Sequence, residues 1–211
     1  MMGHRITALT VQKRDRNRVN VYLDEDFAFG LSRIVAAWLQ VGQDLSDEKL
    51  ASLQAEDARE VAYQKAVNFL SYRDRTQAEV RNHLHALGVQ AETVEWVMER
   101  LERSRLVDDQ RFVHNWVENR NEFRPRSRKA LAYELRQKGI AEGAIQDALE
   151  DHNEDEMAYQ AAVKQAGKLA HLEWLQFRQK MYAHLARRGF NYEISAPVVA
   201  RVWQELHENE R

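Results

Sequence analysis

Two patterns of hydrophobic residues divide this chain. In its N-terminal part, apolar and polar positions alternate, as at Val19, Val21 and Leu23, which is typical of strands with one buried face. The alternation predicts a small antiparallel meander of three short strands, at residues 6–12, at residues 19–23 and around Phe27 and Phe29. Because so few strands need something to pack against, we expect an apolar helix over residues 31–39 to support them.

After residue 45 the pattern becomes helical. Ser46, followed by two acidic residues, is typical of a helix start, where a hydroxyl and negative charges satisfy the free amide groups. Thr76, with Glu79 three residues later, forms a capping box. It indicates that a helix over residues 57–71 has ended and that a second helix begins there.

The helical part repeats itself three times. Each copy has a leucine, three further residues, a glycine and an apolar residue, and the copies are Leu84 to Val89, Leu135 to Ile140 and Leu185 to Phe190. The glycines lie 51 and 50 residues apart. Glycine just past a helix end can adopt the left-handed backbone conformation at low cost. Apolar helical stretches flank every copy, so each predicts a three-helix unit of about fifty residues.

These signals predict a mainly α-helical protein with a small β meander in front. The expected domains are residues 1–56, 57–107, 108–152 and 153–207. In the third repeat Ser195 replaces an apolar residue, and Pro197 lies inside the last helical pattern. Both departures leave the shape of that repeat open.

Composition narrows the class of protein. Hydrophobic residues make up 44% and charged residues 30%, with two prolines and eight glycines, which favours long helices with solvated faces. The absence of cysteine excludes disulfides and thiolate metal sites. No apolar run reaches the roughly 18 residues that cross a bilayer, and the first residues lack a signal-peptide pattern, so we expect a cytoplasmic protein.

The net charge of −2 hides a strong segregation of charge along the chain. Residues 120–138 carry seven basic and two acidic side chains, residues 141–160 carry seven acidic and no Lys or Arg, and residues 164–188 carry six basic and one acidic. Such blocks create local fields that can steer a charged partner. Helix faces that simply face solvent explain any single block equally well.

One basic segment is the best candidate site, and we call residues 120–129 the basic elbow. It carries Arg120, Arg124, Arg126, Arg128 and Lys129 around Pro125. Arginine suits two-pronged contacts with carboxylates or phosphates, and proline stiffens the loop that presents it. From the residues alone, a binding surface and a solvated face are equally supported.

Other chemistry finds little support. The chain has no phosphate-binding loop, no dinucleotide fingerprint, no nucleophile elbow and no zinc-protease motif, so we expect no enzyme, no cofactor and no metal. His83 and Glu79 share a helix face, but His85 points elsewhere. Residues 151–162 lack the glycine and the glutamate of a calcium loop. Trp116 fits core packing, whereas Trp174 is more open to an interface role.

With these residues in view, the chain resembles the RecX family, bacterial regulators of the RecA recombinase. The resemblance covers Tyr63 to about Leu206 and is strongest in FLSYRDRTQAEVRNHL, RLVDDQRFVHNWVENR, RPRSRKALAYELRQKGI and RRGFNYEI. The residues up to Gln43 look like an extension found in longer members. The family implies three tandem three-helix repeats in an elongated, curved array.

The resemblance also implies a function. It implies binding in the groove of the RecA–DNA filament, which bridges successive subunits and depresses ATP hydrolysis and strand exchange. We expect a monomer that contacts the filament, with direct contact to single- or double-stranded DNA left open. An autonomous DNA-binding helical array is the alternative. The candidate binding residues are Arg120, Arg124, Arg126, Arg128, Lys129, Arg136, Lys138, Lys180, Arg187 and Arg188.

Overall fold

The computed structural model describes residues 3–208, and this range contains four strands and ten helices. The strands are β1 (His4–Val11), β2 (Arg18–Leu23), β3 (Asp26–Ser32) and β4 (Asp44–Leu45). The helices are α1 (Arg33–Ala36), α2 (Asp47–Leu70), α3 (Gln77–Ala86), α4 (Ala91–Arg103), α5 (Asp109–Phe123), α6 (Arg128–Gln137), α7 (Glu142–Leu149), α8 (Glu154–Leu169), α9 (Trp174–Ala186) and α10 (Tyr192–Glu208). The predicted class, mainly helical with a small antiparallel sheet in front, is confirmed.

The chain forms two compact units. One contains the residues up to 75 together with 80–107, and the other contains 76–79 and the residues from 108 onward. The first turn of α3 thus belongs to the second unit, while the rest of that helix belongs to the first.

The sheet has the order β3-β2-β1-β4, and all of its neighbours are antiparallel. Alternation placed β2 correctly, because Val19, Val21 and Leu23 are the buried side chains of that strand. The fourth strand was not predicted. It has two residues, which pair with His4 and Arg5, and such a short segment shows no alternation.

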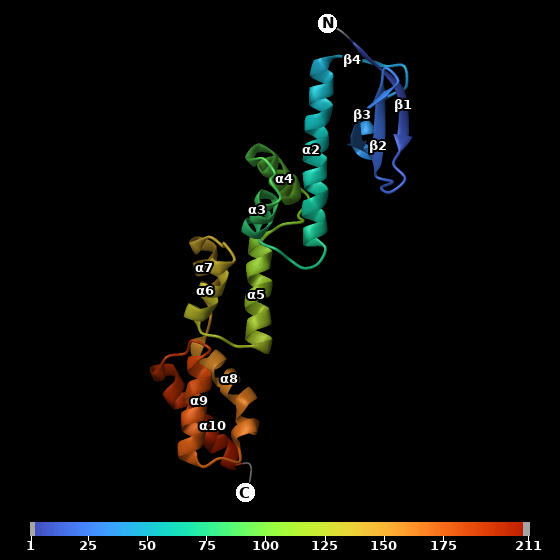
Figure 1. Ribbon diagram of the computed structural model, residues 1–211. Coiled ribbons are helices and arrows are strands. Elements are labelled where there is room, and N and C mark those ends of the chain that lie inside the picture. The colour runs from blue at the N-terminus through green and yellow to red at the C-terminus, as the bar shows by residue number, and fades with distance from the viewer. Residues whose placement is uncertain (1–2, 209–211) are drawn as a thin grey trace. The chain divides into compact units, whose positions relative to one another are not determined.

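The prediction of a helix over residues 31–39 is wrong in its extent. Leu31 lies in β3 opposite Val19, and only Arg33–Ala36 is helical. The chain then turns at Gly42, whose φ is +91°, and returns to the sheet. Pairing with β2 is what keeps Leu31 in the strand. The main support is α2, which lies beside the sheet and contributes Leu53 to its core (Figure 1).

Helix α2 begins where the sequence predicted, because the Ser46 hydroxyl accepts the amide of Lys49 at 3.2 Å. The helix then continues without a break for 24 residues. Leu53 packs in the core of the sheet, whereas Ala62 and Ala66 pack in the core of the first repeat. The boundary expected after residue 56 therefore falls inside one helix, and the domain limits stay a prediction.

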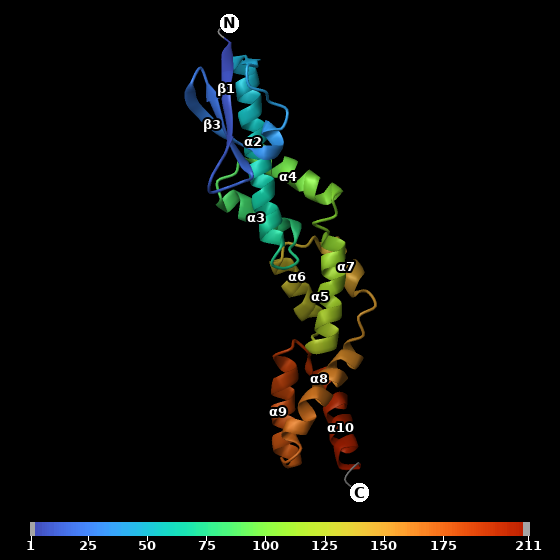
Figure 2. The same ribbon diagram turned by 90° about the vertical axis from the view of Figure 1, so that its right-hand side faces the viewer.

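Three three-helix repeats follow, as predicted. The first is made of the C-terminal half of α2 with α3 and α4, the second of α5 to α7 and the third of α8 to α10, whose helices pack together in Figure 2. Each repeat closes its own hydrophobic core. The cores are centred on Leu84 and Leu101, on Leu131 and Leu135, and on Phe177 and Met181.

The predicted glycine turns are confirmed in all three repeats. Gly88, Gly139 and Gly189 have φ values of +74°, +76° and +92°. In each turn the amide after the glycine donates to the carbonyl of the repeated leucine, at 3.1 Å in the first repeat and 3.2 Å in the other two. This bond satisfies a carbonyl that the helix end would leave free.

The predicted capping box at the start of α3 is also present. The Thr76 hydroxyl accepts the Glu79 amide at 3.2 Å, and the Glu79 carboxylate accepts the Thr76 amide at 3.3 Å. In the third repeat, Ser195 is buried and α10 continues through Pro197 to Glu208. The third repeat is therefore complete despite Ser195 and Pro197.

Candidate functional site: the basic elbow

Proline chemistry shapes the basic elbow. The residue before a proline is pushed away from helical backbone, and Arg124 accordingly has φ −145° and ψ 66° and caps α5. Pro125 is buried, and the hydroxyl of Ser127 then caps α6 by accepting the amide of Ala130 at 3.2 Å. The middle of the elbow, residues 124–127, is therefore a fixed loop between two capped helices.

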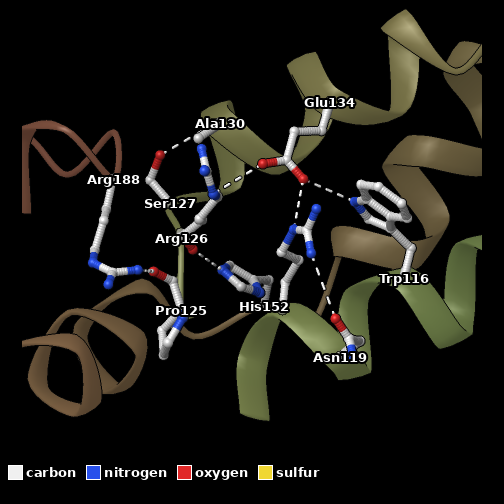
Figure 3. A network of polar contacts seen from close by, with 10 residues as sticks. Trp116, Asn119, Pro125, Arg126, Ser127, Ala130, Glu134, His152 and Arg188 are labelled. Carbon is white, nitrogen blue, oxygen red and sulfur yellow. Dashed lines mark hydrogen bonds and ion pairs between the residues drawn. The ribbon is translucent and has the colours of Figure 1, made fainter. Parts of the chain in front are cut away.

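Glu134 on α6 is the centre of a polar network behind the elbow (Figure 3). Its carboxylate accepts the Trp116 indole N–H at 2.9 Å and Nε of Arg120 at 2.9 Å. Nε of Arg126 lies 2.9 Å from the other carboxylate oxygen. The Arg120 guanidinium also covers the Trp116 ring, 4.2 Å from its centre. One carboxylate thus ties both helices to the loop between them.

The turn of the third repeat closes the elbow from the other side (Figure 3). The Arg188 guanidinium donates to the Pro125 carbonyl at 3.3 Å, and the Ser127 amide donates to the Arg188 carbonyl at 3.1 Å. Nε2 of His152 forms a hydrogen bond with the Arg126 carbonyl at 3.0 Å. The elbow is therefore a joint between the second and third repeats as well as a surface.

This joint gathers positive charge. Burial lowers the pKa of Arg188, and the guanidinium groups of Arg126, Arg124 and Arg187 lower it further. Nε of Arg188 donates to Nε2 of His184 at 2.9 Å, which requires that nitrogen to be unprotonated. Burial, Arg188 and Arg187 lower the pKa of His184 accordingly. Among these groups Glu134 is the carboxylate that neutralises Arg126, so the remaining charge favours an anionic partner.

The structure divides the ten candidate residues into two groups. Within residues 3–208, the side chains of four are exposed and have no hydrogen bond or ion pair: Arg124, Lys129, Lys180 and Arg187. The other six are engaged inside the protein. They are Arg120 and Arg126 with Glu134, Arg128 with the carbonyls of Glu150 and His152, Arg136 with Glu142, Lys138 with Glu79, and Arg188 with Pro125 and His184.

Two of the engaged residues lie away from the joint. Arg136 forms a two-pronged pair with Glu142 at 2.8 and 2.6 Å, and this hydrogen bonding lowers the pKa of Glu142. Lys138 is bound to Glu79 at 2.8 Å. Sequence reasoning could not separate these pairs from free cations, because their acidic partners lie up to 59 residues away.

Trp116 packs against the core of its repeat as predicted, and an interface role for Trp174 stays a prediction. Trp116 is half-buried against Phe112, with ring centres 5.6 Å apart, and supports the elbow from within. Trp174 is 36% exposed but contacts Trp203, with ring centres 5.4 Å apart. Trp38, to which the sequence assigned no role, is 87% exposed.

No helix between residues 3 and 208 is both long and apolar enough to cross a bilayer.

The fold defines the class: a helical-repeat protein with a small N-terminal sheet. Sequence comparison shows the family. Four family models match in chain order. They are the RecX regulatory protein N-terminal domain (residues 4–46) and the first, second and third three-helix domains of RecX (residues 62–101, 108–149 and 153–199). The chain belongs to the RecX family of regulatory proteins.

Individual relatives and solved structures are similar to most or nearly all of the chain. The regulatory protein RecX of Bacillus pumilus is 30% identical over 97% of this chain and 78% of its own length. That of Clostridium botulinum is 30% identical over 92% of this chain and 94% of its own length. A crystal structure of regulatory protein RecX superposes with a TM-score of 0.71 at 26% identity, covering 92% of this chain and 98% of that one. RecX from Lactobacillus salivarius gives a TM-score of 0.58 at 25% identity, over 72% of this chain and 98% of that one.

Proposed function

We propose that this protein regulates RecA by binding in the groove of the RecA–DNA filament, where it bridges subunits and depresses ATP hydrolysis and strand exchange. The observation that carries the proposal is membership in the RecX family over all four of its domains. The arginine cluster at the joint of the second and third repeats adds a surface for an anionic partner.

The chemistry of that surface suits either carboxylates or phosphates. Arg124 and Arg187 are exposed, and Arg126 and Arg188 lie beside them with their guanidinium groups partly held. Arginine forms two parallel hydrogen bonds with either kind of anion. A protein that acts in this way needs no catalytic residue of its own, and we propose that it does not hydrolyse ATP.

Direct binding to DNA is the second candidate function, and the same arginine cluster is the observation that favours it. The two candidates differ in their response to salt. Binding to bare DNA through phosphates weakens steeply as salt rises. Binding to a filament includes protein contacts, so part of its affinity persists at the same salt.

Co-sedimentation tests both candidates together. The protein is mixed with RecA filaments, with free RecA and with bare single- and double-stranded DNA at matched salt. We expect it to pellet with the filament at salt concentrations that release it from bare DNA, and to slow RecA's DNA-dependent ATPase. Equal affinity for bare DNA and filament at every salt concentration would favour the DNA-binding candidate instead.

A further inference from the structure

A five-residue pattern occurs twice, in the loops between the first two helices of the first repeat and of the second repeat, and we call both loops elbows. Residues 72–76 read YRDRT and residues 123–127 read FRPRS, so each is an aromatic residue, an arginine, one residue, an arginine and a hydroxyl residue. The copies are 51 residues apart, the same spacing as Gly88 and Gly139. In the third repeat the five residues that end at the cap of the middle helix, 169–173, read LAHLE and lack the pattern.

The two copies agree in burial as well as in sequence. The aromatic side chain is exposed in both, 84% for Tyr72 and 61% for Phe123. The first arginine is exposed, the second is half-buried and the hydroxyl residue is buried in each copy. Four of the five equivalent positions thus have the same degree of burial, whereas Asp74 is exposed and Pro125 is buried. The Arg73 guanidinium also donates to the Asp74 carbonyl at 2.8 Å, so the two copies share their pattern of exposure but not every contact.

The inner part of each copy is fixed by its own repeat. Arg75 lies over the Phe69 ring, 3.9 Å from its centre, and Arg126 pairs with Glu134 at 2.9 Å. Thr76 and Ser127 each cap the following helix by accepting an amide at 3.2 Å. The outer part, an aromatic ring followed by an arginine, is therefore presented from a rigid base, which reduces the entropy lost on binding.

The charges near the two copies distinguish between kinds of partner. Asp74 stands between the arginines of the first copy, and Glu122 precedes the aromatic residue of the second; both are exposed. They lower the positive charge of both copies, which weakens binding to a continuous phosphate backbone that depends on charge alone. A protein surface with an apolar recess beside a carboxylate accommodates the ring and the arginine, and aromatic residues with arginine are the usual anchors of protein interfaces.

We propose that the two elbows are equivalent docking elements, and that each binds the same kind of site on a protein that presents this site repeatedly. The site is an apolar recess for the aromatic ring next to a carboxylate for the arginine. This inference rests on the proposed function, because a filament of identical subunits offers one such site per subunit. Two anchors on one chain then gain affinity by avidity.

Alanine substitutions test the proposal. We compare Tyr72→Ala, Phe123→Ala and the double variant with Tyr133→Ala, a control that removes an equally accessible aromatic side chain, 62% exposed, outside the pattern. Affinity for RecA filaments is measured at fixed salt, with circular dichroism and melting as checks of folding. We expect each single variant to bind about tenfold more weakly. The affinity of the double variant should fall by the product of the two single effects, and that of the control should change less than twofold. A conservative variant, Tyr72→Phe, should retain binding.

The outcomes separate this inference from the function on which it rests. If the wild-type protein does not bind filaments, the proposed function fails. If the wild type binds and the double variant binds equally well, only the docking elements are wrong. A double variant no weaker than a single one excludes two equivalent sites. Parallel loss of affinity for bare single-stranded DNA would show that the elbows contact nucleic acid and would overturn the protein partner. Arg124→Glu, which changes an exposed side chain in the second copy, repeats the test without removing a ring.

Discussion

At the scale of single residues, the three repeated glycines have the same conformation but different surroundings. A side chain at Gly88 would meet open space. A Cβ at Gly139 would collide with that of Ala78, and one at Gly189 would collide with the Ser127 hydroxyl and lie 2.8 Å from the Cβ of Ala130. Glycine is thus needed at all three positions for its backbone, and at two of them also for the room it leaves.

Alanine substitution should separate these two requirements. Gly88→Ala is expected to lower the free energy of unfolding by about 1–2 kcal/mol, the cost of a left-handed L-residue. Gly189→Ala should cost more, because its Cβ also displaces the start of α6. Urea denaturation of the two variants, monitored by circular dichroism, measures the difference. Equal losses would show that the start of α6 adjusts freely.

Two histidines at the joint predict a dependence of stability on pH. Burial is the first cause that lowers the pKa of both His152 and His184, below the ordinary value of 6.5. The unfolded chain therefore binds protons that the folded chain does not, and stability is full above pH 6.5 and falls as the pH drops towards the lowered values. Thermal melting between pH 7.5 and 5 should show this fall. His184→Gln should reduce it, and a variant with an unchanged slope would contradict the assignment.

At the scale of secondary-structure elements, the elbow combines two roles that the sequence could not distinguish. Arg120 and Arg126 hold α5 and α6 to Glu134, while Arg124 faces solvent between them. A basic loop therefore contains both structural and free arginines. The distinction matters because charge reversal of a structural arginine changes the fold as well as the surface.

Removing the central carboxylate should weaken the elbow. Glu134→Gln leaves Arg120 and Arg126 without a counter-ion at a site where the Glu134 side chain is 17% exposed. Hydrogen bonds to charged groups contribute about 1.5–3 kcal/mol, so we expect a loss of that order in urea denaturation. Glu142→Gln breaks the solvent-exposed pair with Arg136 and serves as the control, for which little change is expected. Similar losses in both variants would mean that the network does not hold the elbow.

Reversing the free charges should separate binding from stability. Arg124→Glu with Arg187→Glu alters two exposed side chains that have no internal partner in the described part of the chain. We expect filament binding to be lost and the melting temperature to stay nearly unchanged. The variant with Glu at 124, 126 and 128 should melt lower, because it also breaks contacts to Glu134 and to the carbonyl of Glu150. Normal binding by the folded double variant would exclude this surface.

At the scale of the whole molecule, the chain is a series of separately closed cores. The core of the second repeat draws all of its buried residues from positions 112–149, and that of the third from 158–202. No buried side chain is shared between these two clusters in the residues described. Each repeat therefore closes its core without buried side chains from its neighbour.

Truncation after Asp151 should exploit this independence. It removes the third repeat with Arg187 and Arg188, yet leaves the cores of the first two repeats complete. We expect the truncated protein to stay folded but to inhibit RecA's DNA-dependent ATPase only at concentrations roughly 10² higher, since avidity is lost with each contact. Titration of both proteins in one ATPase assay measures this. Coinciding inhibition curves would show that two repeats suffice.

The sequence by itself determined the features that arise from local backbone chemistry. Ser46 and the Thr76–Glu79 box start their helices as predicted, because caps act within three residues. The three glycines end theirs for the same reason. Repetition of these local signals was enough to predict three three-helix repeats, since a unit that closes its own core needs no distant partner.

Only the tertiary structure decided what depends on distant pairing. Leu31 is apolar in either a helix or a strand, and its pairing with Val19 places it in β3. Lys138 is basic whether free or bound, and Glu79 binds it from 59 residues away. All arginines of the elbow carry the same charge. Packing leaves Arg124 in solvent and places Arg126 beside Glu134. Residue type sets which contacts are chemically available, but the fold decides which of them form.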